Sequence, residues 1–356
     1  MPGIHGLRGL AALAVVLYHV VELSGIATPV GFAFIRRDCK YGAHLFFVLS
    51  AFSLMYSTER NMHRPGWVSE YFIKRFFRIA PLFYCMFLLL TLRQWLAGGA
   101  VVGIRTILLN ITFAFGFVPW SDFVWGGWTI GVEMIFYVIF PVLLLTIKTS
   151  RQALILTILL SLVSCAARYQ LTAEYLRTDP RPRWDWSYFS FISNVYFFAA
   201  GIFAYRFGKE LKEGFVLNIA IPWGACIVLA VLLFTELDSG LRKGGRPDLV
   251  IWAVGFTALC IWQGLRPCAW IGSKVLEYVG ERSYSVYLLH PTIVFFLKKW
   301  IVGGYAFLLP YVGKYAYFIC VFLVLMIVLV VAELTYRFIE VPGIKLGRRY
   351  ISKHTA

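Results

Sequence analysis

The chain has 356 residues, of which 60% are hydrophobic, and its mean hydropathy is +0.74. These values exclude an ordinary soluble domain and indicate a polytopic helical membrane protein. The formal charge of +16 does not indicate nucleic-acid binding, because Lys and Arg are scattered through short loops rather than gathered on one face. We expect anionic lipid headgroups and a phosphate-bearing ligand as counter-charges, and no nucleic-acid partner.

Recurring apolar runs predict an all-α fold with about ten transmembrane helices. They lie near residues 6–24, 41–57, 79–97, 128–147, 152–168, 188–206, 217–234, 249–265, 283–301 and 314–338. The apolar segment 104–118 is shorter, so it is either re-entrant or an eleventh span. The first run lacks a basic region and an A-x-A-like cleavage site, so we expect a retained helix rather than a signal peptide. Residues 1–340 are expected to form one integral membrane domain, and residues 341–356 a short basic tail.

The basic residues of the short loops indicate the orientation. The densest cluster follows the second helix and comprises Arg60, Arg64, Lys74, Arg75 and Arg78. The positive-inside rule assigns this loop, and with it the N-terminus and the basic tail, to the cytoplasm. The loops 177–186 and 241–248 are also basic and would lie outside, which weakens the bias.

Two ionisable residues lie within the first apolar run. Arg8 and His19 are eleven residues apart, close to three helical turns, so they project from nearly the same face about 16 Å apart. Burying an ionisable group in the membrane costs free energy, so such a residue usually has a function or a polar partner. Either His19 bonds a neighbouring helix while Arg8 snorkels to the interface, or the pair lies along a reaction path through the helices.

Five further residues stand out by type and position. Arg75 and Arg78 share one helical face, and are either a positive-inside boundary or a fork for phosphates. Glu133 lies in an apolar helix, where it must pair with a buried Arg or His or orient a substrate. Tyr287 and His290 share a face and either form a hydrogen-bonded pair or, with Pro291, mark a kink.

Several chemistries are not indicated. The seven cysteines include no C-x-x-C pair and no Cys/His cluster at metal-ligand spacing, so we interpret them as core residues and expect no metal. The sequence lacks a G-x-S-x-G elbow, a Walker A loop and a convincing dinucleotide fingerprint.

Arg337 and Glu340 are spaced for a local ion pair at the end of the last span.

Six segments together resemble the membrane acyltransferase-3 family, whose members acylate sugars and other acceptors. The segments, in the family's order, are RGLAALAVVLYH, YGAHLFFVLSAFSL, YFIKRFFRIAPLFY, WTIGVEMIFYVIFPVLL, YVGERSYSVYLLHPTIV and LTYRFIEVPGIKLGRR. The family's Arg and His match Arg8 and His19, and its R-x-x-R matches Arg75 and Arg78. The resemblance covers nearly the whole chain and implies that 1–340 is an acyltransferase domain.

Three positions depart from the family pattern. His44 stands where relatives commonly carry Asp, Ala51 where they carry Gly, and Met134 where a second acidic residue is frequent. These departures affect acceptor specificity more than reaction class. Some relatives carry an appended hydrolase-like domain, and we expect none here.

Acyl transfer to an alcohol needs a base, a group that stabilises the oxyanion and an anchor for the donor. A neutral histidine is a natural base, with His19 the first choice and His290 the second. We assign catalytic roles to His19, Glu133, Arg8 and His290. Acylation is either direct or passes through an acyl-histidine.

The resemblance implies acetyl-CoA as donor, without a metal, at a cytoplasmic site formed by Arg75 and Arg78. Trp128 and Tyr287 are the expected substrate-binding residues, although Trp128 and its neighbours Trp120, Trp125, Trp184 and Trp186 also fit an interfacial belt.

The expected function is thus acetyl transfer from cytoplasmic acyl-CoA to a hydroxyl of an envelope polysaccharide, oligosaccharide or glycolipid, at the inner membrane. The alternative is a proton-coupled transporter or flippase with a His19–Glu133 relay, although the sequence shows no internal repeat. The other large family of membrane O-acyltransferases resembles the chain much less well.

Overall fold

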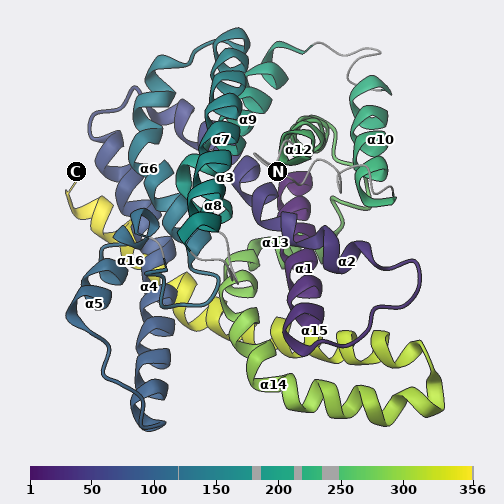
Figure 1. Ribbon diagram of the computed structural model, residues 1–356. Helices are drawn as coiled ribbons and strands as arrows, with labels where there is room; N and C mark the ends of the chain where they lie inside the picture. Colours follow the sequence, from purple (N-terminus) through teal and green to yellow (C-terminus); the bar gives the residue numbers. More distant parts are fainter. Residues whose placement is uncertain (119, 179–185, 212–218, 235–247, 355–356) are drawn as a thin grey trace. The chain divides into compact units, whose positions relative to one another are not determined.

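The computed structural model describes residues 1–118, 120–178, 186–211, 219–234 and 248–354, and within these ranges it is helical without strands (Figure 1). The helices are α1 Pro2–Ser24, α2 Phe34–Arg37, α3 Gly42–Thr58, α4 Trp67–Leu96, α5 Ile104–Ile111, α6 Trp128–Thr146, α7 Ser150–Thr178, α8 Trp186–Phe189, α9 Phe191–Glu210, α10 Ile221–Phe234, α12 Asp248–Leu265, α13 Lys274–Glu281, α14 Ser283–Val312, α15 Tyr315–Thr335 and α16 Val341–His354. Short 3-10 turns and the π-helix η5, Tyr336–Glu340, complete the described elements.

Each of the ten predicted apolar regions contains a helix within the described residues, to which 217 and 218 do not belong, but the number of membrane spans is not confirmed as ten. Seven helical stretches of the described chain are long and apolar enough to cross a membrane: Pro2–Ser24, Trp67–Leu96, Trp128–Thr146, Ser150–Ala173, Trp186–Glu210, Ser283–Val312 and Tyr315–Lys353. The apolar helices Ile221–Leu233 and Leu249–Leu265 are shorter, and α3 has only 17 residues. The segment 104–118 breaks into α5 and a 3-10 turn, and because eight residues rise only about 12 Å, it is not a continuous eleventh span.

Three helix boundaries differ from the prediction. α4 begins at Trp67, so Arg75 and Arg78 lie within the helix rather than before it. α7 and α14 extend ten and eleven residues beyond their predicted ends, 168 and 301, to Thr178 and Val312. Charged residues lowered the local hydropathy at these places, whereas backbone hydrogen bonding continues the helix regardless of side-chain polarity.

The chain divides into two compact units. Unit 1 comprises Met1–Phe46 and Arg266–Val341, and unit 2 comprises Phe47–Leu265 and Pro342–Ala356.

In unit 1, α1 packs against α13 and α14, and α14 packs against α15. Glycines permit the closest approach, because a Cβ on Gly280 of α13 would lie 1.8 Å from the His5 carbonyl oxygen of α1. α14 contains Pro291, and Figure 1 shows that this helix bends along its length. The helix contacts place the middle of α1 beside the first half of α14.

The end of the last predicted span differs from expectation. Arg337 pairs with Glu333, one turn earlier, and not with Glu340. Glu340 is buried and accepts a hydrogen bond from Ser285 of α14. The π-helix Tyr336–Glu340 explains the change, because its wider turn alters which side chains share a face.

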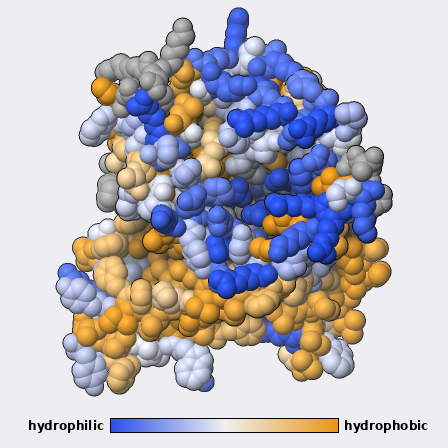
Figure 2. All heavy atoms as spheres, turned by 180° about the vertical axis from the view of Figure 1, so that it is seen from behind, coloured by the Kyte–Doolittle hydropathy of each residue, from blue (hydrophilic) through white to orange (hydrophobic). Residues whose placement is uncertain are grey.

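The surface of α14 and α15 is strongly apolar. Large hydrophobic side chains are exposed along both helices, among them Phe296, Trp300, Phe307, Phe322 and Val330. Figure 2 shows apolar side chains gathered over the lower part of the face it presents, the part in which these helices lie in Figure 1. Such a surface is stable against lipid chains and would be costly in water.

In unit 2, α9 is the central helix and contacts α6, α7, α8 and α12. Its Phe198 stacks on Phe136 of α6 at 4.1 Å between ring centroids. Glu59, after α3, accepts bonds from Tyr205, Arg206 and Lys209 of α9. Burial alone would raise the pKa of Glu59, but these bonds outweigh it and lower the pKa to about 2. A charged network therefore ties the end of α3 to α9.

Candidate active site

The predicted site residues fall into both units and are described unit by unit. Unit 1 holds Arg8, His19, Tyr287 and His290, whereas unit 2 holds Arg75, Arg78, Trp128 and Glu133.

The two histidines that the sequence offered as separate candidates form one pair. His19 of α1 and His290 of α14 are 271 positions apart, yet His19 Nδ1 lies 3.0 Å from His290 Nε2. The rings meet edge to face with centroids 4.8 Å apart. His290 is fully buried, whereas His19 keeps partial exposure.

The neighbouring carbonyls determine which nitrogen carries each proton. His290 Nδ1 lies 3.1 Å from the Val286 carbonyl oxygen, and His19 Nδ1 lies 2.9 Å from the Val15 carbonyl oxygen. A carbonyl only accepts, so in both neutral rings Nδ1 is the donor. The His19 N–H is then shared between Val15 and His290 Nε2. This leaves the lone pair of His19 on Nε2, with which no group of the described residues forms a hydrogen bond.

Aromatic rings surround this pair. Tyr18 meets His19 edge-on at 4.8 Å, and Tyr287 meets His290 at 5.7 Å between centroids. Phe46 packs against the other side of Tyr287 at 5.6 Å. Tyr287 and His290 therefore meet as a ring contact, whereas the ring nitrogens of His290 lie within hydrogen-bond distance of Val286 and His19. Arg8 lies on α1 about 16 Å of helical rise before His19, so the two side chains act at different depths.

In unit 2, Arg75 and Glu133 both lie within electrostatic range of Tyr71, although no ion pair joins them. Tyr71 donates a hydrogen bond of 3.2 Å to the Tyr137 carbonyl of α6, which fixes α4 beside that helix. Arg75 Nε is buried and has no hydrogen-bond acceptor within the described part of the chain. Arg78, one turn later, is half-buried.

Trp128, the first residue of α6, belongs to an aromatic cluster. Its ring lies 5.6 Å from Tyr188 and 5.1 Å from Phe189, and Trp120 lies 6.1 Å from Trp186 and 5.9 Å from Phe189. We call these five side chains the aromatic cluster. Trp120 is half exposed, whereas Trp184 lies outside the described residues. A cluster of this kind offers ring faces for stacking.

Two polar residues that the sequence analysis did not single out hold the loop before Trp128. Asn110 of α5 is fully buried, donates to the Ser121 carbonyl and accepts from the Phe123 N–H. Burial raises the pKa of the Asp122 carboxyl to about 6, although the backbone N–H groups of Asp122 and Trp128 act to lower it. The only sequence signal for Asp122 was an acidic residue within the Trp-rich segment PWSDFVWGGW.

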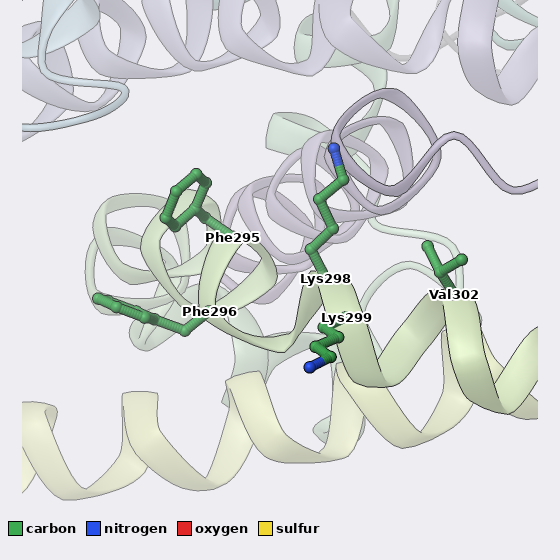
Figure 3. Close-up of a pocket in the computed structure, with 5 residues that line it drawn as sticks. All are labelled: Phe295, Phe296, Lys298, Lys299 and Val302. Carbon is green, nitrogen blue, oxygen red and sulfur yellow. The ribbon is translucent and has the colours of Figure 1, made fainter.

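An open pocket lies on α14 beyond the histidine pair. Phe295, Phe296, Lys298, Lys299 and Val302 line it, and Figure 3 shows Lys298 and Lys299 pointing to different sides of the helix. None of the predicted catalytic residues lines this pocket. Among the described residues, no group of three His, Cys, Asp or Glu side chains is placed to hold a metal ion.

Comparison with known proteins gives the family. The model of the acyltransferase domain family, acyltransferase-3, matches residues 1–333. Among similar proteins are the peptidoglycan O-acetyltransferase OatA of Listeria monocytogenes (serovar 1/2a, strain EGD-e), 26% identical over 378 residues, and the O-acetyltransferase OatA of Staphylococcus aureus (strain NCTC 8325 / PS 47), 24% identical over 384 residues.

These alignments cover 98% of this chain but only 56% and 58% of the two relatives, so the chain spans little more than half of their length. No solved structure matches. The apolar helices and the family together identify a multi-pass membrane protein. The predicted resemblance is confirmed, and the chain belongs to the acyltransferase-3 family.

Proposed function

We propose that this protein transfers an acetyl group from cytoplasmic acetyl-CoA to a hydroxyl of an envelope saccharide. The observation that carries the proposal is the His19–His290 pair, which orients one unprotonated nitrogen within an apolar helical unit. The family and the names of its relatives support acetyl transfer, and the name of the Listeria protein supports a cell-wall saccharide as acceptor. His19, His290, Arg8 and Glu133 are the proposed catalytic set.

In the proposed reaction the acceptor hydroxyl oxygen attacks the thioester carbonyl carbon, and His19 Nε2 takes the hydroxyl proton. The carbon–sulfur bond then breaks, and the CoA thiolate takes the proton back from the imidazolium. His290 acts through His19, because accepting the Nδ1–H keeps the lone pair on Nε2 and supports the charge that forms there. Glu133 or Arg8 would then steady the acceptor or the oxyanion.

Arg75 and Arg78 are the proposed binding residues for the phosphates of the donor. The buried Nε of Arg75, for which the described residues provide no acceptor, supports this role. The basic surroundings of the R-x-x-R segment support a donor site on the cytoplasmic side, where we also propose the N-terminus. Trp128 and its aromatic cluster, at the opposite end of α6 from residue 146, are the proposed stacking surface for the saccharide, and Tyr287 the second contact.

A hydrogen-bonded pair of histidines also suits a proton relay, which is the feature that favours the transporter alternative. The two functions predict different products. A transporter moves an unchanged solute, whereas the proposed enzyme consumes acetyl-CoA and forms an ester.

The test uses purified protein in lipid nanodiscs with radiolabelled acetyl-CoA and a cell-wall glycan fragment. We expect label in an alkali-labile glycan ester, and we expect His19→Ala to lower the rate by a factor of about 100 to 10,000. His63→Ala is the matched control, because His63 is an exposed loop histidine. An unlabelled glycan with the wild type, or full activity in His19→Ala, would contradict the proposal.

A further inference from the structure

Arg168 of α7 is a buried cation that the acyl-transfer chemistry above does not use. It lies five residues before the end of the apolar stretch Ser150–Ala173, about 8 Å of helical rise from that end. An arginine this close to the end of a membrane span usually extends its guanidinium group to the membrane–water interface. Here the side chain points inward, since only 1% of Arg168 is exposed.

The bonds of Arg168 leave most of its donors unused. Nη2 donates to the Ser193 carbonyl and, at 3.2 Å, to Asn194 Oδ1. Nε and Nη1 are buried and have no hydrogen-bond acceptor among the described residues. A guanidinium has five N–H donors, so with the two on Nη2 used, three remain without a partner.

The described residues also do not balance the charge of Arg168. None of their carboxylates forms an ion pair with it, and its guanidinium carbon lies 5.7 Å from the centroid of the Tyr196 ring. Arg206 shows the contrast, because this buried arginine of the same unit pairs with Glu59. A buried, unpaired cation is costly, and an anion that reaches it gains strongly.

The surroundings of Arg168 also favour the binding of an anion. It lies against the first turn of α9, whose N-cap residue Ser190 makes no capping bond. The N-terminus of a 20-residue helix carries a partial positive charge, which adds to that of the guanidinium. Buried Ser190, Ser193 and Asn194 provide a polar wall beside it.

This polar wall continues to the aromatic cluster. Asn194 Nδ2 donates to the Tyr188 carbonyl at 2.8 Å, and the Tyr188 ring contacts Trp128. A ligand that stacks on the aromatic cluster and carries an oxyanion would thus have both of its features recognised within unit 2.

We propose that Arg168 binds an oxyanion of the acceptor, so that the acceptor is an acidic saccharide with a carboxylate or phosphate close to the acylated sugar. This rests on the proposed function for the identity of the acceptor. Arg168 is a specificity-determining residue and takes no part in bond making.

The experiment measures binding and acetylation with matched probes in zwitterionic nanodiscs. One pair is a tetrasaccharide that alternates glucuronic acid with N-acetylglucosamine, and the same tetrasaccharide with its carboxylates reduced to alcohols. A second pair is N-acetylglucosamine 1-phosphate and the methyl glycoside of N-acetylglucosamine. The preferred pair distinguishes a carboxylate from a phosphate.

We expect the wild type to bind the acidic member of one pair about 10- to 100-fold more tightly than its neutral partner. Arg168→Gln should lower this ratio to near one, and Arg168→Lys should retain part of it, because lysine keeps the charge without the planar fork. Arg206→Gln, the matched control, should leave the ratio unchanged. If Arg168→Gln does not fold, the ratio in Arg168→Lys decides.

Equal binding of acidic and neutral probes by the wild type, or an unchanged preference in the Arg168 variants, would overturn the inference. Anionic lipid vesicles that compete fully with the acidic saccharide would also overturn it, because a lipid headgroup would then be the ligand. If Arg168-dependent binding persists but no probe is acetylated, the proposed function fails and the anion site stands.

Discussion

The hydrogen bond between His19 and His290 joins two residues that the sequence suggested only as alternatives. Each is separately held by the carbonyl one turn before it, Val15 and Val286. The pairing could not be predicted, because hydropathy and helical spacing describe one helix at a time. The sequence did indicate that burying an imidazole at this depth costs free energy. A hydrogen-bond partner on another helix offsets that cost.

The role of His290 gives a residue-level prediction. His290→Leu removes the acceptor for His19 Nδ1–H and should lower kcat about tenfold to a hundredfold with little change in KM for acetyl-CoA. His290→Gln, which retains an acceptor, should recover part of kcat. Steady-state kinetics of the purified variants provide the measurement.

Thr292→Val is the control for this series, because the Thr292 hydroxyl is buried in the same helix and has no hydrogen-bond partner among the residues that the structure describes. It should keep full activity. If His290→Leu is as active as this control, His290 does not position His19.

Asp122 gives a prediction about pH. Its folded pKa of about 6 exceeds the reference value of 3.8, so the folded state binds more protons than the unfolded state between these values. The free energy of unfolding therefore decreases as the pH rises from about 4 to 6, by roughly 2–3 kcal/mol for this group. Thermal unfolding of the detergent-solubilised protein across this range is the measurement.

Asp122→Asn is the comparison, because an amide oxygen can still accept from Trp128 N–H but does not titrate. The variant should lose this part of the pH dependence and be the more stable form at pH 7. An identical pH dependence in both proteins would show that Asp122 is not the responsible group.

At the level of the helices, hydropathy predicted where helices lie better than where they end. Each of the ten predicted regions contains a helix in the described part of the chain, yet α4 begins twelve residues before its predicted start, because SEYFIKRFFR is amphipathic rather than apolar. Similarly, Lys298 and Lys299 lowered the hydropathy of α14 without ending it. For the same reason the hydropathy pattern ended the predicted helix at Arg168, whereas this residue lies inside α7.

The contact of α1 with α13 gives a prediction about packing. Ala at Gly280 would place its Cβ 1.8 Å from the backbone oxygen of His5, which cannot move without shifting α1. Gly280→Ala should therefore destabilise the protein by roughly 2 kcal/mol or more. Gly304→Ala in α14 meets no atom within 4 Å and should be neutral or stabilising by about 0.5–1 kcal/mol. Equal melting temperatures for the two variants would contradict the close-packed contact.

Arg75 and Arg78 give the prediction for α4. Replacing both with Gln should weaken CoA binding about tenfold or more and make the residual binding less sensitive to salt, since each contributes a charged hydrogen bond. Lys replacements should recover only part of the affinity. Calorimetric titration with CoA is the measurement, and Arg93→Gln is a control further along the helix. Unchanged affinity in the double Gln variant would return both residues to a simple membrane-boundary role.

At the scale of the whole molecule, composition predicted the class correctly, and six motifs in order predicted the family. Composition could not give the count of spans, because α3, α10 and α12 are apolar but short for a bilayer. The expectation of one domain over residues 1–340 with a basic tail stays a prediction. Within the described chain, residues 341–354 form α16, whose Gly343 and Gly347 approach Pro81 and Phe77 of α4.

The most direct test of the account is transfer across a sealed membrane. Vesicles of known orientation receive labelled acetyl-CoA only on the face that carries Arg75 and Arg78, and the saccharide only on the other face. We predict ester formation in this arrangement, none when the two substrates are exchanged, and a rate about 100- to 10,000-fold lower with His19→Ala. Transfer that needs both substrates in one compartment, or that keeps the wild-type rate in His19→Ala, would contradict this prediction.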